Sequence, residues 1–136
     1  LKNHDTEQAI QYLQEAIALD PEYMEAILVL MSIYSKEEKY DEIIDLYNHI
    51  SSQDFDWTAL YPFVAEAYDK EEEFKKAYEL YQAAYLDFKE DPTFLEKYCY
   101  FLLEDGKQEQ AKEIAKQLVA LDPTEQQYIE LLERFE

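Results

Sequence analysis

The same residue types recur at intervals of 34 along this chain. Tyr34 and Tyr68 are one interval apart, and Leu102 follows after another. Ala77 and Ala111 hold a second recurring position. A fixed period of this length, with small and aromatic residues at set positions, is typical of stacked helical hairpins. Because such stacks present an extended surface to other molecules, the period favours a binding scaffold over an enzyme.

The composition fits one helical repeat domain. Of the 136 residues, 48% are hydrophobic, and 13 Tyr and 7 Phe predict an aromatic core. One Gly and four Pro leave few turn signals, which favours helices with short connections. No run approaches the roughly 18 apolar residues of a membrane-spanning helix, so we expect no membrane partner. A single cysteine cannot form an internal disulfide, and a cytoplasmic protein is therefore expected.

The charge is strongly acidic, with 12 basic against 32 acidic residues and a net charge of −20. Phosphate backbones would be repelled by this field, so nucleic acid is not an expected partner. Two interpretations of the charge stay open. The carboxylates can simply solvate the outer helix surfaces, or they can attract a basic partner and raise its rate of encounter.

Apolar residues at helical spacing predict eight helices joined by short connections. Three Asp-Pro pairs, at 20–21, 91–92 and 122–123, predict helix starts, because Asp caps a helix and Pro fits its first position. Asp5 and Gln8 form a candidate capping box for the first helix. The predicted helices span about 5–19, 22–37, 40–52, 57–70, 73–89, 92–105, 107–121 and 124–135.

Two features predict irregular backbone. Gly106 follows the sixth predicted helix, at the left-handed position that glycine adopts at low cost. Glu38 and Glu72 occupy the same position in the two preceding hairpins, where we expect strain. Pro62 lies past Asp56, the expected cap of the fourth helix, so that helix should either kink or begin late, near the proline.

These patterns resemble the tetratricopeptide repeat (TPR) family, whose hairpins carry small and aromatic residues at the same positions. Three full repeats are expected at 24–57, 58–91 and 92–125, of which the middle one matches best, with Ala65, Ala77 and Tyr81 in place. Met31 and Ile43 depart from the family because they are bulky at small positions. The resemblance implies an all-α fold, a right-handed superhelical array of antiparallel hairpins. It implies one domain over 1–136, with a partial repeat at 1–23 and a final helix at 126–136, as part of a longer array.

The resemblance also implies a binding groove on the concave side, lined by the first helix of each hairpin. The implied groove residues are Leu28, Val29, Ser32, Phe63, Glu66, Glu96, Lys97, Tyr100 and Leu103. Only Lys97 supplies a cation at the positions where chaperone-binding members carry several, which does not support that role. The expected function is a non-enzymatic scaffold that binds a peptide or helix of another protein, with basic residues flanking apolar anchors. The alternative is a self-assembly segment of a longer repeat protein or of a homo-oligomer.

The histidines and the cysteine do not predict a metal site or a catalytic site that would compete with the binding scaffold. His4 and His49 lack a second ligand at metal-binding spacing. Cys99 falls at a small-residue position between helices, which predicts a buried packing thiol in place of a nucleophile. We therefore expect no catalytic residue, no metal and no cofactor.

Overall fold

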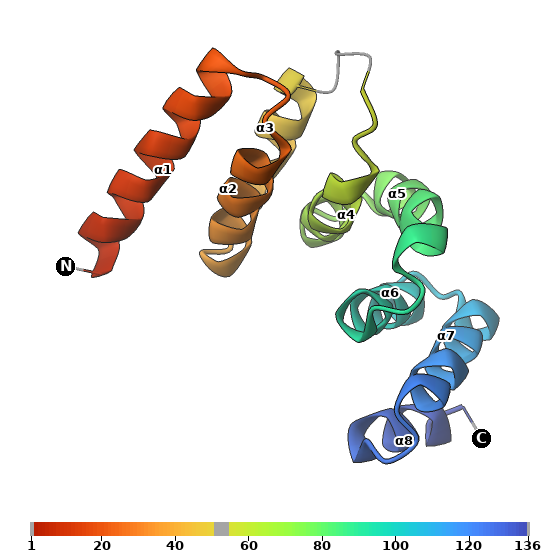
Figure 1. Cartoon of the computed structure of the whole chain (residues 1–136). Coiled ribbons are helices and arrows are strands. Elements are labelled where there is room, and N and C mark those ends of the chain that lie inside the picture. Colours follow the sequence, from red (N-terminus) through yellow and green to blue (C-terminus); the bar gives the residue numbers. More distant parts are fainter. Residues whose placement is uncertain (1, 51–54, 136) are drawn as a thin grey trace. The chain divides into compact units, whose positions relative to one another are not determined.

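Every regular element in the described part of the chain, residues 2–50 and 55–135 of a computed structural model, is a helix. Figure 1 shows the elements, which confirm the predicted all-helical repeat fold. In chain order they are α1 (Lys2–Leu19), α2 (Met24–Lys36), α3 (Tyr40–Ile50), the 3₁₀ helix η1 (Thr58–Leu60), α4 (Tyr61–Lys70), α5 (Phe74–Phe88), α6 (Pro92–Glu104), α7 (Gln108–Leu121) and α8 (Gln126–Glu133). Most of the predicted helix ends agree with these bounds to within a residue or two. The predicted end of the third helix, at residue 52, lies outside the described residues.

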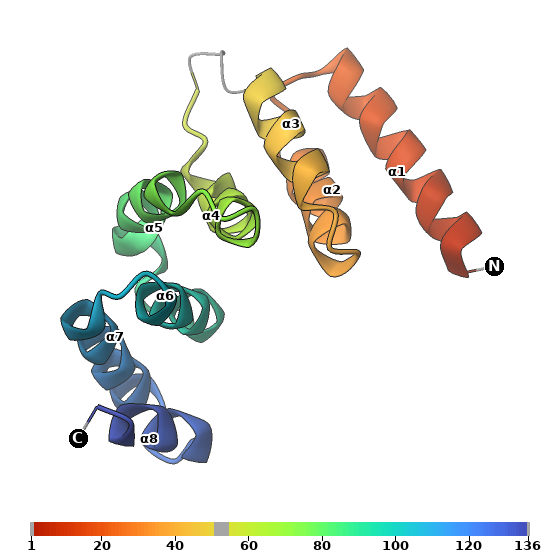
Figure 2. The same ribbon diagram turned by 180° about the vertical axis from the view of Figure 1, so that it is seen from behind.

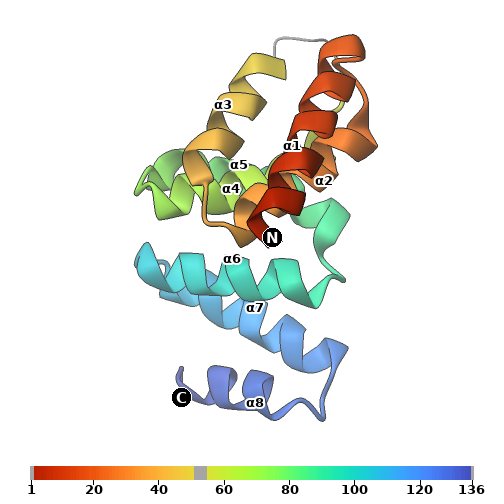
Figure 3. The same ribbon diagram turned by 90° about the vertical axis from the view of Figure 1, so that its left-hand side faces the viewer.

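The helices form two compact units, Leu1–Ala77 and Tyr78–Glu136, which are described separately. In the first unit α1 packs on α2, α3 packs on α4, and α2 also contacts both α3 and α4 (Figure 2). In the second unit α6 packs on α7 and α7 on α8, with neighbouring helices antiparallel (Figure 3). Short connections force this antiparallel order. The single-domain organisation stays a prediction.

The core of the first unit is built from stripes of apolar residues at helical spacing. The buried stripe of α2 consists of Ala26, Ile27, Leu30, Met31 and Tyr34. Met31 and Ile43 are fully buried although both are bulky where the TPR pattern is small. The first unit therefore accommodates larger side chains at these helix crossings than the family pattern implies.

The core of the second unit is an aromatic cluster around Tyr81. The ring centre of Tyr81 lies 5.1 Å from those of Tyr98 and Phe101 and 5.8 Å from that of Phe94. All four rings are buried. Burial of one such ring contributes about 1.5–3 kcal/mol, and aromatic contacts add about 0.5–1.5 kcal/mol per pair. The predicted aromatic core is thus located between α5 and α6.

The caps of α6 and α1 test two predicted helix starts. Asp91 is the N-cap of α6, its carboxylate accepts a hydrogen bond from the Thr93 amide at 3.0 Å, and Pro92 opens the helix. This prediction is confirmed. The start at Asp5 is wrong, because α1 already begins at Lys2 and Asp5 lies within its first turns.

The other two Asp-Pro pairs form turns that precede a helix. The Asp20 carboxylate accepts a hydrogen bond from the Glu22 amide, but α2 begins only at Met24. Asp122 bonds the Thr124 amide in the same way, and α8 begins at Gln126 after its own cap, Glu125. The predicted caps at Asp20 and Asp122 are therefore wrong, and each helix begins two residues later than expected. An Asp-Pro pair satisfies a turn as well as a helix end, so the motif alone does not distinguish them.

Pro62 delays the start of α4, which is the second of the two predicted outcomes, a late start in place of a kink. The chain forms the short helix η1 before α4 begins at Tyr61, with Pro62 in the first turn. The Asp56 carboxylate accepts hydrogen bonds from the amide and hydroxyl of Thr58, at 3.0 and 2.6 Å. Asp56 therefore forms a turn just before η1, whose N-cap is Trp57, and the expected cap role of Asp56 is wrong. The regular helix α4 begins where proline costs no backbone hydrogen bond.

Three turns between paired helices share a left-handed residue. Gly106 has φ 77°, Glu38 has φ 58° and Glu72 has φ 61°. Each turn is closed in the same way, for example by the Lys107 amide bonding the Leu102 carbonyl at 2.8 Å. Glu38 and Glu72 thus adopt the left-handed backbone that underlies the expected strain, because a Cβ atom in this region comes close to the following carbonyl oxygen.

Candidate functional site

The predicted groove residues of the first unit lie on α2 and α4. We call this surface the α2–α4 face, and it comprises Leu28, Val29, Ser32, Phe63 and Glu66. Val29 is 50% exposed, and the other four side chains are partly buried. The Ser35 hydroxyl donates a hydrogen bond to Oε1 of Glu66 at 3.0 Å, which joins the two helices. This face therefore carries one exposed apolar side chain, Val29, and one carboxylate, Glu66, that is hydrogen-bonded to Ser35.

The predicted groove residues of the second unit lie on α6. They are Glu96, Lys97, Tyr100 and Leu103, and Tyr100 is 50% exposed. Tyr100 lines a depression of about 290 Å³ together with residues of α8. A hydrogen bond to Glu96, aided by partial burial, raises the pKa of Tyr128 to about 12. Glu96 and Tyr128 thus link α6 to α8, and we call the surface that they share the α6–α8 face.

The sequence analysis did not identify the α8 side of this depression. Its residues there are Gln127, Glu130, Leu131 and Arg134. Glu130, Leu131 and Arg134 lie one repeat period after the groove residues Glu96, Lys97 and Tyr100, so extending the repeat by one more helix would have found these three. Lys97 was predicted to be the only cation of the groove, and Arg134 adds a second one at this depression.

The nine predicted residues therefore fall into two groups, one in each compact unit. The first group lies on the two helices α2 and α4, and the second group lies on α6 alone. Each face combines an exposed apolar side chain, Val29 or Tyr100, with at least one carboxylate. A continuous groove that uses all nine residues stays a prediction.

The residues with reactive side chains have structural surroundings. Cys99 is buried, its thiol donates to the Ala111 carbonyl at 3.4 Å, and burial raises its pKa to about 11. Such a thiol is protonated and packed, as predicted. His49 is exposed, whereas the side chain of His4 lies outside the described residues. In the described part of the chain, His, Cys, Asp and Glu form no group of three that could hold a metal ion.

The length and apolar character of the described helices were compared with what a membrane-spanning helix requires. None of those in residues 2–50 and 55–135 has both the length and the apolar character needed to cross a bilayer.

Comparison with known proteins agrees with this geometry. Residues 1–66 match the family described as tetratricopeptide repeat, and residues 60–125 match the YpiA-like, C-terminal tetratricopeptide repeats. The whole chain is 38% identical to the TPR repeat-containing protein YpiA of Bacillus subtilis (strain 168). The chain spans 32% of the length of that relative.

Solved structures of similar fold include MamA and YrrB. MamA superposes with a TM-score of 0.82 at 16% identity, over 98% of this chain and 78% of its own. YrrB, described as a TPR protein with an unusual peptide-binding site, superposes with a TM-score of 0.78 at 18% identity, over 98% of this chain and 69% of its own. The repeat spacing, the helical hairpins and these matches lead to one conclusion: the chain belongs to the tetratricopeptide repeat family.

Proposed function

We propose that this chain is a non-enzymatic scaffold that binds a peptide or helix of a partner protein on the faces formed by the first helices of its hairpins. The observation that carries the proposal is Tyr100, half exposed at the rim of a depression whose other wall is α8. An aromatic ring beside a hollow is a typical anchor site for a partner side chain. The description of YrrB as a peptide-binding TPR protein supports the same role.

The charges around the two faces define the partner. Glu130 and Arg134 line the depression at Tyr100, Glu96 lies one helical turn before Tyr100 on α6, and Glu66 lies one turn after Phe63 on α4. With a net charge of −20, the chain attracts basic segments and repels acidic ones. We therefore propose a partner segment with apolar anchors and basic flanks. We also propose that binding takes place in the cytoplasm, because disulfides are rare there and the single cysteine of this chain is buried and free.

A second role, self-assembly, is favoured by exposed apolar residues outside the two faces. Leu86 of α5 is 74% exposed and Leu19 of α1 is 89% exposed. Such side chains can form contacts with a second copy or with another part of a longer array. Light scattering over a range of concentrations distinguishes the roles, because self-assembly requires a mass that rises with concentration.

The scaffold proposal is tested by removing one anchor in each unit. Partners captured from a lysate on immobilised protein are identified, and the dissociation constant of a purified partner is then measured for each variant. We expect Tyr100→Ala or Phe63→Ala to weaken binding about tenfold or more, as anchor residues do. Tyr12→Ala is the matched control, since Tyr12 is 71% exposed on α1 and belongs to neither face.

Melting temperature and helicity serve as the check on folding. Tyr100→Ala should change neither, because half of the ring is already in solvent. If both anchor variants bind as tightly as the native protein, the binding surface lies elsewhere and the proposal is wrong. If Phe63→Ala unfolds the first unit, Phe63 is a core residue and the proposal rests on Tyr100 alone.

A further inference from the structure

A second hollow lies in the first unit, away from the two faces described above. It has a volume of about 520 Å³ and is bounded by α1, α2 and α3. Its apolar lining consists of Ile17, Ala18, Pro21, Leu30, Leu46 and the ring of Tyr34, whose hydroxyl accepts a hydrogen bond from the Gln14 side chain at 3.2 Å. Its polar lining includes Glu42, Asp45 and His49 of α3. The hollow is therefore an apolar site with an acidic edge.

The second unit contains the same site two repeat periods later, and there a side chain of the protein fills it. Ile17 of α1 corresponds to Tyr85 of α5, and His49 of α3 corresponds to Gln117 of α7. The hollow beside Tyr85 measures only about 180 Å³. The Tyr85 hydroxyl donates a hydrogen bond of 2.6 Å to Oε1 of Gln117. Leu30 and Tyr34 of the first site correspond to Tyr98 and Leu102 of the second, so the two sites also differ at these lining positions.

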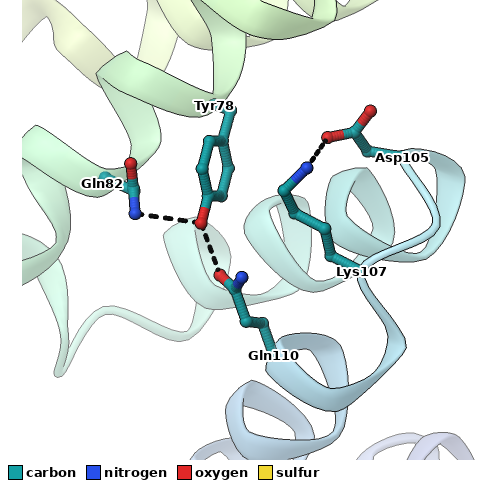
Figure 4. Close-up of polar contacts among 5 residues, drawn as sticks. All are labelled: Tyr78, Gln82, Asp105, Lys107 and Gln110. Carbon is teal, nitrogen blue, oxygen red and sulfur yellow. Dashed lines mark hydrogen bonds and ion pairs between the residues drawn. The ribbon is translucent and has the colours of Figure 1, made fainter.

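A second tyrosine of α5 repeats the pattern two helical turns earlier. Figure 4 shows the Tyr78 hydroxyl between Gln82 and Gln110, at 3.0 and 2.9 Å. Lys107 lies above the Tyr78 ring, 4.5 Å from its centre. In the first unit the corresponding residue is Ile10, which lines a separate hollow of about 300 Å³ with Glu7, Glu37 and Lys39. Space is thus left at both positions where α1 carries isoleucine and α5 carries tyrosine.

The edge of the larger hollow also indicates the charge of its ligand. Glu42 stands where the second unit has the neutral Gln110, and Asp45 corresponds to Glu113. Among the described residues that line the hollow, none is a lysine or an arginine. Two carboxylates at the edge of an apolar site favour cationic residues next to the group that enters it.

We propose that the hollow between α1, α2 and α3 binds a tyrosine side chain of a partner protein that is flanked by lysine or arginine. The ring takes the place that Tyr85 occupies in the second unit, with its hydroxyl directed at His49, the counterpart of Gln117. The flanking cations lie beside Glu42 and Asp45. This site is independent of the α2–α4 and α6–α8 faces and so of the function proposed for them.

The test uses an acetylated, amidated pentapeptide, Gly-Lys-Tyr-Lys-Gly, titrated into isotopically labelled protein by NMR at low salt. We expect saturable shifts of the amides of Ala18, Leu30 and Leu46, which line the hollow. Ile17→Tyr should weaken binding about tenfold or more, because the new ring fills the hollow as Tyr85 does. Leu19→Tyr adds the same ring at an exposed position of α1 and should leave binding unchanged.

Two further peptides test the chemistry of the ligand. Replacing the tyrosine by alanine should abolish the shifts, and replacing both lysines by glutamate should weaken binding about tenfold. A double variant, Glu42→Gln with Asp45→Asn, should reduce the preference for lysine, and it provides the test if Ile17→Tyr does not fold.

Several outcomes would overturn the proposal. One is equal affinity of the native and Ile17→Tyr proteins, and another is equal affinity for the lysine and glutamate peptides. A third is a hollow already covered by a second copy, seen as shifts of the Ala18 and Leu46 amides that depend on protein concentration without peptide. A fourth is a hollow covered by another segment of the protein, seen as no response to any peptide until that segment is removed.

Discussion

Glu72 and Gly106 adopt the same left-handed backbone conformation, with φ 61° and 77°, one repeat period apart. The two turns also share their hydrogen bonds, since the Glu73 and Lys107 amides each reach back to a carbonyl of the preceding helix at 2.8 Å. One turn therefore holds the residue type that suits this conformation, and the other holds a residue type that resists it.

We predict that Glu72→Gly stabilises the protein by up to about 1 kcal/mol. The left-handed conformation costs a side-chain-bearing residue about 1–2 kcal/mol, and the extra freedom of glycine in the unfolded chain offsets about half of that gain. Urea unfolding of both proteins measures the difference. Glu71→Gly is the control, because Glu71 has φ −90° and glycine there should be destabilising. A loss of stability in Glu72→Gly would show that its backbone is not strained.

The reverse substitution, Gly106→Ala, should destabilise the second unit by about 1 kcal/mol. A Cβ atom at Gly106 would meet nothing within 4 Å, so the expected cost comes from the backbone conformation alone. Thermal unfolding followed by circular dichroism measures it. A cost above about 3 kcal/mol would exceed the backbone effect and imply a contact that the native turn does not contain.

The helical elements were largely predictable because repeat period and apolar spacing depend on local sequence. Asp91 and Pro62 act through the chain immediately around them, and both predictions were confirmed. Asp20 and Asp122 were misassigned because an Asp-Pro pair closes a turn equally well. The hollow beside Ile17 was not predictable in this way, because it depends on how side chains from three helices fill the space between them.

Ala111→Leu should cost about 1–3 kcal/mol of stability, since it overpacks the contact between α6 and α7. Ala111 is fully buried, and its carbonyl accepts the Cys99 thiol at 3.4 Å, so the added side chain has no free space. Ala120→Leu on the exposed side of α7 should change stability by less than about 0.5 kcal/mol. Chemical denaturation of both variants makes the comparison. Equal effects would mean that α6 and α7 do not pack closely at Ala111.

Stability should decline in alkaline solution. Burial raises the pKa of Cys99 from its ordinary 9.0 to about 11 and that of Tyr98 from 10.0 to about 12. Because both groups hold their protons more tightly in the native state, the unfolded chain loses protons first as the pH rises. Stability from these groups is complete below pH 9 and is lost between about pH 9 and 12, by roughly 2 kcal/mol for each group.

Denaturant unfolding at pH 8, 10 and 11 tests this alkaline loss. Cys99→Ala serves as the control, because it removes the earliest part of the decline, between pH 9 and 10, while the tyrosine part persists at higher pH. A free energy of unfolding that stays constant up to pH 11 would contradict the raised pKa values.

The burial of Cys99 also makes its thiol an internal probe of local opening. The chain has one cysteine, and its thiol is enclosed at the contact with Ala111, so a thiol reagent reacts only after the surrounding helices have separated. When separation is rare and reclosing is fast, the labelling rate measures the equilibrium between closed and open forms of the second unit. Transient opening of that unit can thus be followed in the native protein, without any inserted probe, and compared between free and partner-bound states.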